Sequence, residues 1–502
     1  EIRAFRLSEA AARLVDIEPR LASASPRLKA LYQSTTGELF FRQYDYARAL
    51  VAQGKAHDLL SALYGGDHAE TARAETALGS GLFSAGRYAE ATAMLQHAVA
   101  VYDQDTRFYA PALAVALVNL GQVYYATGRT PLAVAALDRA IVLVRQSAGQ
   151  GGQIEATALL HRGYAKLRQN DFGAAAADLQ AAIDIWARPE TVNRRAAAGA
   201  GVWLAEAERR AGRFVDANAV LDHSAAVLTD IFGAESYAMS DVLLGQGELA
   251  MAREQPEQAI TLLNHALTIR TAAVGADHIA SLDVRSVLAV ALARHGDITE
   301  ARQRIAAVTT VVRRRMALQS LSGSGMPLDE VEAARRLLGR HVAILAMAQK
   351  TTPDDQAGIV DEAFDIGQLA RASAAGRAIA DLSARQSSEN AQVATALREV
   401  QERILRWQMA ERALSAQVAA AESQSDLLGA QQGVERLGVA ATEAASAFAE
   451  ANPAQVKMVA GAPASVSDIH QALRTGEALL SYLTQEDQSF LWLVTRQRAA
   501  LI

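Results

Sequence analysis

The sequence of 502 residues is long enough for about three ordinary domains or for one extended repeat array. Half of the residues are hydrophobic but only 5% are aromatic, which favours closely packed helices over a β-sandwich. The formal net charge of −6 provides neither a basic surface for nucleic acid nor a polybasic surface for membranes. Because cysteine is absent, disulfides, cysteine-ligated zinc and thiol nucleophiles are excluded from this chain.

The compartment is predicted from the same features. No apolar run reaches the roughly 18 residues of a membrane span. The sequence begins at Glu1, and a removed leader and an arbitrary boundary of the sequence both account for the missing Met. We therefore expect a cytoplasmic protein, with a periplasmic or secreted protein after removal of a leader as the alternative. Arginine outnumbers lysine by 44 to 5, which we interpret as the coding bias of a high-GC, bacterial genome.

A repeat of 42 residues occupies the first part of the chain. Residues 87–98 match residues 129–140, and aligning all copies on one alanine reveals the period. The aligned alanines are Ala49, Ala91, Ala133, Ala175, Ala217, Ala259 and Ala301. Twelve residues earlier a second small residue recurs, at Gly37, Gly79, Gly121, Gly163, Ala205, Gly247 and Ala289. A period held over seven copies predicts seven repeated structural units.

Each repeat is predicted to be a helix hairpin. Small residues at two fixed points let two antiparallel helices cross closely. Pro131 and Pro256 fit the first turn of the second helix, where a missing N–H costs little. Between the helices, residues that tolerate a left-handed conformation recur at Gly86, Gly128, Asn170, Gly212 and Gly296. Because one hairpin cannot bury its apolar face alone, we predict a right-handed α-solenoid with a concave groove.

The pattern Leu-Gly-x-x-Tyr…Ala-x-x-x-Leu-x-x-Ala over residues 120–140 resembles the tetratricopeptide repeat. The 42-residue period, and the Gly-x-Asp-His connectors in residues 64–71 and 274–281, resemble the long-helix variety found in kinesin light chains. This resemblance covers roughly residues 30 to 315 and implies that a protein or peptide binds in the groove. In that variety an asparagine before the pattern's leucine helps to hold a peptide backbone, and here only Asn119 matches it.

The other copies have different residues at the asparagine position, namely Ala77, His161, Trp203, Gly245 and Val287. We therefore keep two interpretations of the groove, a solvated helix face and a partner-binding site. The residues expected to face it are Asn119, Tyr125, Tyr164, Arg168, Glu206, Arg209, Arg210, Glu248 and Arg294. If a partner binds there, replacing Arg209 and Arg210 by Ala should weaken its capture more than about tenfold without changing the melting temperature.

A helical spacer is predicted after the array. A Ser/Gly-rich break at residues 318–330 marks the boundary, and a helix is expected over residues 364–386. Two series of apolar residues at alternating spacings of 3 and 4 then predict a coiled-coil seam, interrupted once by Glu411. They are Val393, Leu397, Val400, Ile404, Trp407, Leu414 and Val418, followed by Val434, Leu437, Ala441, Ala444 and Phe448. A hairpin that turns near residues 422–426 is favoured over one helix of roughly 95 Å.

The last segment differs from the rest, since residues 476–502 predict two strands and a turn. A Pro/Gly/Ala linker and a short helix capped by Ser465 or Ser467 precede them. The helix at 467–473, the segment 476–482 and the segment 492–495 resemble the start of the CHAT family, a caspase-related domain. The resemblance implies an α/β sheet with a His–Cys dyad downstream of these first strands, and neither residue can be assigned on this sequence.

We therefore predict an all-α protein with three parts: a solenoid of tetratricopeptide type over residues 1–320, a helical spacer over 321–463, and the start of a CHAT domain over 464–502. The predicted function is that of a partner-sensing arm that controls a caspase-like peptidase domain beyond this chain. The alternative is a non-enzymatic scaffold that acts by protein binding alone. The partner is expected to be a protein or peptide, without membrane or direct nucleic-acid binding.

No catalytic residue, cofactor or metal site is predicted. The ten histidines form no H-E-x-x-H motif, and no carboxylate pair stands out. His68 and His278 recur in the same connector and are expected to be turn and cap donors. All four tryptophans are expected to pack in the core or in the seam; they are Trp186, Trp203, Trp407 and Trp492.

Overall fold

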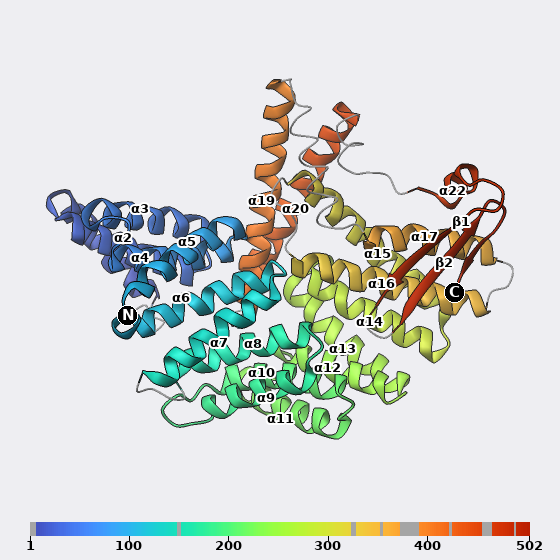
Figure 1. The fold of residues 1–502 in the computed structure, drawn as a ribbon, viewed down its shortest axis with the longest axis horizontal. Coiled ribbons are helices and arrows are strands. Elements are labelled where there is room, and N and C mark those ends of the chain that lie inside the picture. The colour runs from blue at the N-terminus through green and yellow to red at the C-terminus, as the bar shows by residue number, and fades with distance from the viewer. Residues whose placement is uncertain are drawn as a thin grey trace. The chain divides into compact units, whose positions relative to one another are not determined.

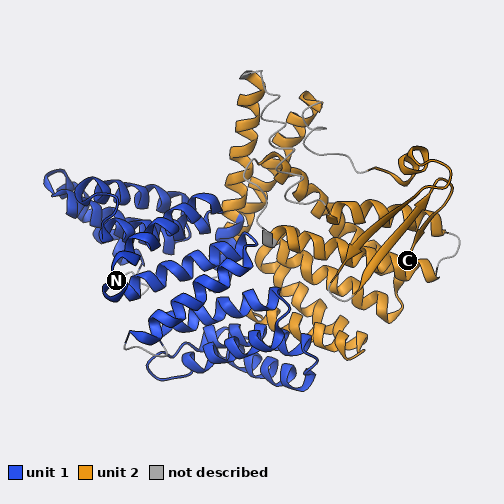
Figure 2. Ribbon diagram, viewed as in Figure 1, with its two compact units in different colours: residues 1–234, 411–422 blue, residues 235–410, 423–502 orange. Residues whose placement is uncertain are grey.

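The computed structural model describes residues 7–147, 152–322, 328–351, 355–371, 391–420, 424–453, 464–485 and 488–502. It divides into two compact units, coloured separately in Figure 2. The first unit comprises residues 1–234 and 411–422, and the second comprises residues 235–410 and 423–502. Each unit is described by itself below.

The first unit is a stack of five helix hairpins that follow one another along the chain (Figure 1). Helix α1 (Leu7–Ile17) and a 3-10 segment (Glu18–Ser23) precede them. The hairpins are α2 (Pro26–Arg42) with α3 (Tyr46–Tyr64), α4 (Ala69–Ser84) with α5 (Tyr88–Tyr102), α6 (Thr106–Ala126) with α7 (Thr130–Gln146), α8 (Gln153–Arg168) with α9 (Phe172–Trp186), and α10 (Arg194–Arg210) with α11 (Phe214–Phe232). A second 3-10 segment, Asp103–Asp105, joins α5 to α6.

The second unit begins with two more hairpins, α12 (Tyr237–Ala252) with α13 (Pro256–Val274) and α14 (Ile279–His295) with α15 (Ile298–Leu321). The seven predicted hairpins are therefore confirmed in the described residues. The remaining helices are α16 (Leu328–Thr351), α17 (Gln356–Arg371), α19 (Ala391–Ala420), α20 (Gln424–Ala451) and α22 (Val466–Ala472). The last residues of α19, from 411 onward, belong to the first unit.

Close contact between the two helices of a hairpin explains the periodic small residues. All seven aligned alanines have 0% exposed surface. A methyl group added to Gly121 would lie 2.8 Å from Cγ of Leu137, and one added to Gly163 would lie equally close to Cγ of Leu179. The glycine therefore provides the space that the leucine of the second helix fills.

The turns inside the hairpins have the predicted left-handed residue. Gly86 has φ 78° and Asn170 has φ 61°. In two hairpins the sequence pattern showed no candidate, and there Tyr44 and Glu254 adopt φ 59° at the same repeat position. A non-glycine residue with positive φ is strained. The repeat geometry therefore imposes this conformation even where the residue type does not favour it.

A small antiparallel sheet lies in the second unit against α17 (Figure 1). Its strands are β1 (Ala478–Thr484), β2 (Ser489–Thr495) and β3 (Ala499–Leu501), in that order. The third strand was not predicted, because three residues are too short for a pattern. Trp492 is fully buried and its ring lies 6.2 Å from that of Phe364 on α17.

The spacer is a pair of long helices, α19 and α20, rather than one continuous helix. Trp407 of α19 lies against Gly438 of α20, since a methyl group added to Gly438 would lie 3.1 Å from Nε1 of Trp407. Ser465 caps α22 and forms a capping box with Asp468. Four predicted features fall wholly or partly outside the described residues: the centre of the Ser/Gly break, the helix after residue 371, the turn before residue 424 and the linker at 454–463.

Two expectations are wrong in detail. Trp203 does not pack in a core, since its side chain is 44% exposed, whereas the other three tryptophans are buried. His68 and His278 do cap α4 and α14, but as acceptors: each ring accepts a hydrogen bond from the backbone N–H two residues later. An N-cap side chain must satisfy the free N–H groups of the first turn, so acceptance is the required role.

Candidate partner-binding surface on the first helices

The nine predicted groove residues all lie on the first helix of a hairpin. Asn119 and Tyr125 are on α6, Tyr164 and Arg168 on α8, and three more are on α10, namely Glu206, Arg209 and Arg210. Glu248 on α12 and Arg294 on α14 belong to the second unit. The structure thus brings seven of the nine together in one unit.

An aromatic group lies on α8 and α10 in the first unit. The ring of Tyr164 is 4.9 Å from that of Trp203 and 5.6 Å from that of His161. Burial lowers the pKa of His161 to about 4, so this imidazole is neutral at physiological pH. Trp203 occupies the same repeat position as Asn119 and His161. The group is therefore an apolar surface whose largest member is open to solvent.

Arg168 lies one turn after Tyr164 on α8. Its guanidinium lies 3.7 Å from the ring centroid of Tyr125 and donates to the carbonyl oxygen of the same residue. In the second unit, Arg294 likewise donates to the carbonyl oxygen of Met251, at 3.3 Å. Both arginines thus bind the end of the first helix of the preceding hairpin, where carbonyl groups lack intrahelical partners.

Arg209 and Arg210 have different surroundings. Arg209 forms a two-bond ion pair with Glu206, with both N–O distances 2.8 Å. Arg210 donates to Oδ1 of Asn170 at 3.0 Å, and its guanidinium lies 4.5 Å from the ring centroid of Phe172. Because Arg210 joins two hairpins, its removal affects stability, and the expectation of an unchanged melting temperature applies to Arg209 alone.

Glu248 takes part in a charge network of the second unit. It lies 3.7 Å from Arg340, which in turn pairs with Asp283 at 2.6 Å and donates to Ser286 at 2.7 Å. The Arg340 guanidinium contributes to a lowered pKa of Asp283, against the opposing effect of burial. This network links α12, α14 and α16, so Glu248 contributes to the stability of the second unit.

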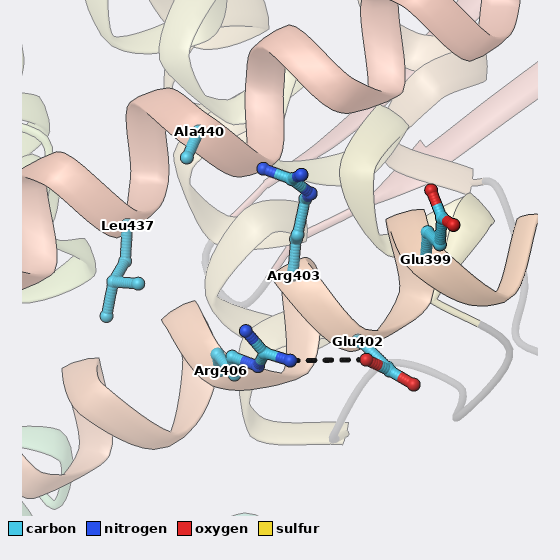
Figure 3. A pocket seen from close by; sticks show the side chains of 6 residues that line it. All are labelled: Glu399, Glu402, Arg403, Arg406, Leu437 and Ala440. Atoms are coloured by element: carbon cyan, nitrogen blue, oxygen red, sulfur yellow. Dashed lines mark hydrogen bonds and ion pairs between the residues drawn. The ribbon is translucent and has the colours of Figure 1, made fainter. Parts of the chain in front are cut away.

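A shallow recess between α19 and α20 offers little for a small ligand (Figure 3). Glu402 and Arg406 pair across one helical turn at 3.2 Å, with both side chains about two-thirds exposed. Its lining is Glu399, Glu402, Arg403, Arg406, Leu437 and Ala440. Such a charged, open surface lacks the enclosed apolar walls of a ligand pocket.

In the part of the chain that the structure describes, no group of three histidine or acidic side chains is arranged to hold a metal ion. Among the described helices, none has the length and the apolar character needed to cross a membrane.

Sequence reasoning does not single out Trp203 as a surface residue. It shares its repeat position with Asn119, yet the sequence analysis expects it to be buried. Position in the repeat is the better signal, because the repeat fixes which face of the helix each position occupies.

Several solved structures are similar to this chain. A putative kinesin light chain from Podosopora anserina is 18% identical, with a TM-score of 0.35, over 40% of this chain and 95% of that one. BtubC from P. vanneervenii is 17% identical, with a TM-score of 0.37, over 47% and 90%. The quorum sensor NprR from B. thuringiensis is 14% identical, with a TM-score of 0.49, over 62% and 84%. No curated protein sequence matches the chain.

The family model of the tetratricopeptide repeat matches three stretches, residues 30–104, 112–188 and 238–311. These stretches coincide with six of the seven hairpins. The unmatched hairpin, α10 with α11, has the same buried small residues, with Ala205 2% and Ala217 0% exposed. The three matched stretches of this chain are similar to the tetratricopeptide repeat.

Proposed function

We propose that this chain is the partner-sensing arm of a protein that also contains a caspase-like CHAT domain. The partner, a protein or an extended peptide, binds the first helices of the first unit. The observation that carries the binding step is Trp203, an exposed tryptophan at the repeat position of Asn119 whose ring lies 4.9 Å from that of Tyr164. Tryptophan, tyrosine and arginine dominate the energetics of protein interfaces, and Arg168 lies one turn after Tyr164 on the same helix.

The binding step is tested with a phage-displayed peptide library selected on the full chain. Trp203→Ala should weaken the selected peptides at least about tenfold, equivalent to ~1.4 kcal/mol. Phe108→Ala is the matched control, since Phe108 is a 73% exposed aromatic in the same unit, outside the proposed surface. Equal binding to wild type and Trp203→Ala would remove this surface from the proposal.

The regulatory step is supported by the two faces of the sheet. One face is buried on α17, but the other is also apolar: Leu480 is 51% and Tyr482 is 55% exposed, opposite Leu493 and Leu491 on β2. An antiparallel sheet with a solvated face normally has polar residues there. A sheet that is apolar on both faces fits the start of an α/β domain with helices on both sides.

The alternative, a scaffold without an enzymatic domain, uses the same binding surface. The coding sequence that follows Ile502 distinguishes the two: the proposal expects further strands with a histidine and a cysteine in α/β context. If they are present, loss of proteolysis by the whole protein after Cys→Ala substitution completes the test. A continuation without these residues would leave the scaffold as the function.

A further inference from the structure

An arginine recurs at one position of the repeat and contacts the preceding hairpin. Arg168, Arg210 and Arg294 are separated by 42 and 84 residues. Arg168 and Arg294 donate to a carbonyl at the end of the preceding first helix. Arg210 contacts the following turn, where it donates to Asn170 and lies over the ring of Phe172. The turn of a hairpin is thus an acceptor site for an arginine.

The turn between α4 and α5 has no such arginine from its neighbouring hairpin, because the repeat position carries Ala126. Arg412 of α19 takes its place. Arg412 donates to the carbonyl oxygen of Ala85 at 2.9 Å, and its guanidinium lies 5.9 Å from the ring centroid of Tyr88. Tyr88 corresponds in the repeat to Phe172, the ring beneath Arg210.

The fit at this turn depends on Gly86, which corresponds to Asn170. A methyl group added to Gly86 would lie 1.8 Å from Nη1 of Arg412, a distance that excludes any side chain while the arginine is in place. In the described part of the chain Arg412 forms no ion pair within 4.0 Å. Its guanidinium is bound by the carbonyl oxygen of Ala85 and by the ring of Tyr88, in the space that the missing side chain of Gly86 leaves. Lysine lacks the planar group that suits such a site.

The helix segment that carries Arg412 is also held at its end. Arg195, at the start of α10, donates to the carbonyl oxygen of Ala419, one residue before α19 ends. A cation at a helix C-terminus satisfies a free carbonyl and the helix dipole. Leu414 and Val418, one turn apart, are 0% and 2% exposed. Residues 411–420, hereafter the docked segment, belong to the first unit and contact it through Arg412 and the carbonyl oxygen of Ala419.

We propose that the α4–α5 turn is a binding site for an arginine-bearing amphipathic helix, and that the docked segment is its intramolecular ligand. A partner helix that carries such an arginine competes with α19 for this turn. This site is distinct from the surface around Trp203, so it extends the proposed function and stands without it.

The experiment uses the full chain and a fluorescein-labelled peptide of residues 405–420. Wild type should bind the peptide weakly, because its own Arg412 fills the site. Arg412→Ala should bind it at least about tenfold more tightly, and Arg412→Lys should behave like Arg412→Ala. Arg406→Ala, which removes only an exposed pair with Glu402, should bind as weakly as wild type.

A second substitution identifies the turn. Gly86→Ala, added to Arg412→Ala, should weaken peptide binding, because the guanidinium of the bound peptide must shift away from the added methyl group. Gly212→Ala is the matched control, because Gly212 has the same φ of 78° but no atom within 4 Å of an added methyl group. It introduces the same backbone strain and should leave binding intact. Equal effects of the two glycine substitutions would overturn the assignment of the site.

Two further results would overturn the proposal: peptide affinity unchanged by Arg412→Ala, and equal binding of a peptide whose arginine is replaced by alanine. Should Arg412→Ala fail to fold, hydrogen exchange of the wild-type chain gives the answer. Excess peptide should then speed exchange of amides in residues 411–420, and unchanged exchange would contradict displacement.

Discussion

The repeat array and the C-terminal sheet both place a large side chain against a glycine, but they do so in different ways. In the array, Gly121 and Gly163 face leucines of their own hairpins. In the sheet region, Gly367 of α17 faces Trp492 of β2, and a methyl group added there would lie 2.6 Å from Cη2. The first contact is local and recurs with the period, whereas the second joins distant parts of the sequence once.

This difference shows where each region's stability is concentrated. An array distributes stabilisation over many similar interfaces between neighbouring helices. The three-stranded sheet is too small to be stable by itself and depends on its packing against a helix. Its stability should therefore depend on one side chain, Trp492, far more than any hairpin depends on one leucine.

Trp492→Ala tests this dependence and should have the largest effect. Loss of a fully buried tryptophan leaves a cavity and costs about 3–5 kcal/mol. We expect hydrogen exchange of β1 and β2 to become fast while that of α6 and α7 stays slow. Trp203→Ala is the matched control, because Trp203 is 44% exposed and its removal leaves no cavity. Uniform destabilisation of both regions by Trp492→Ala would contradict the comparison.

Gly367→Ala should have the next largest effect. The methyl group meets a rigid indole ring, so overpacking should cost about 1–3 kcal/mol. Gly163→Ala should cost less, because its methyl group meets a leucine side chain and two other repeats carry Ala205 and Ala289 at this position. Thermal unfolding measures both.

Gly173→Ala completes the series, since Gly173 lies in α9 with no atom within 4 Å of an added methyl group. It should stabilise the chain by roughly 0.4–1 kcal/mol through helix propensity and chain entropy. A larger cost for Gly163→Ala than for Gly367→Ala would reverse the comparison between array and sheet.

The same contrast explains how much of the fold was predictable from the sequence. The period specified the seven hairpins, the buried alanines and most of the left-handed turns, because each was repeated in register. The left-handed conformation of Tyr44 and Glu254 was not predictable, since nothing in their residue type indicates a positive φ. The third strand was not predictable either, because only its pairing with β2, from Trp492 with Leu501 to Val494 with Ala499, defines it.

The candidate site was predictable in position but not in contacts. The nine predicted residues all lie on first helices, and their role in partner binding stays a prediction. The repeat could not show that Arg168 lies on Tyr125, or that Arg412 reaches the α4–α5 turn, because both contacts depend on how separate segments pack. Contacts between segments that are distant in the sequence can be identified only in the folded structure. These contacts distinguish an arginine that joins neighbouring hairpins from one, such as Arg412, that we propose a partner helix can replace.

The smallest predicted effect concerns pH and has opposite signs in the two units. In the first unit, a hydrogen bond with Glu75 raises the pKa of His97 above 6.5. The folded state then binds this proton more tightly than the unfolded state, so the stabilisation is complete below about pH 6.5 and is lost as pH rises through the folded pKa. In the second unit, His341 lowers the pKa of Glu362 below 4.5, and Arg302 adds to the effect. That stabilisation is present above about pH 4.5 and is lost as pH falls through the folded value.

Melting temperatures should therefore fall less at alkaline pH in His97→Gln, and less at acid pH in Glu362→Gln, than they do in wild type. Both side chains are about 40% exposed, so solvent screening keeps the shifts small. Parallel pH profiles for wild type and both variants would show that neither pair contributes to folding, and that the two units do not differ in this respect.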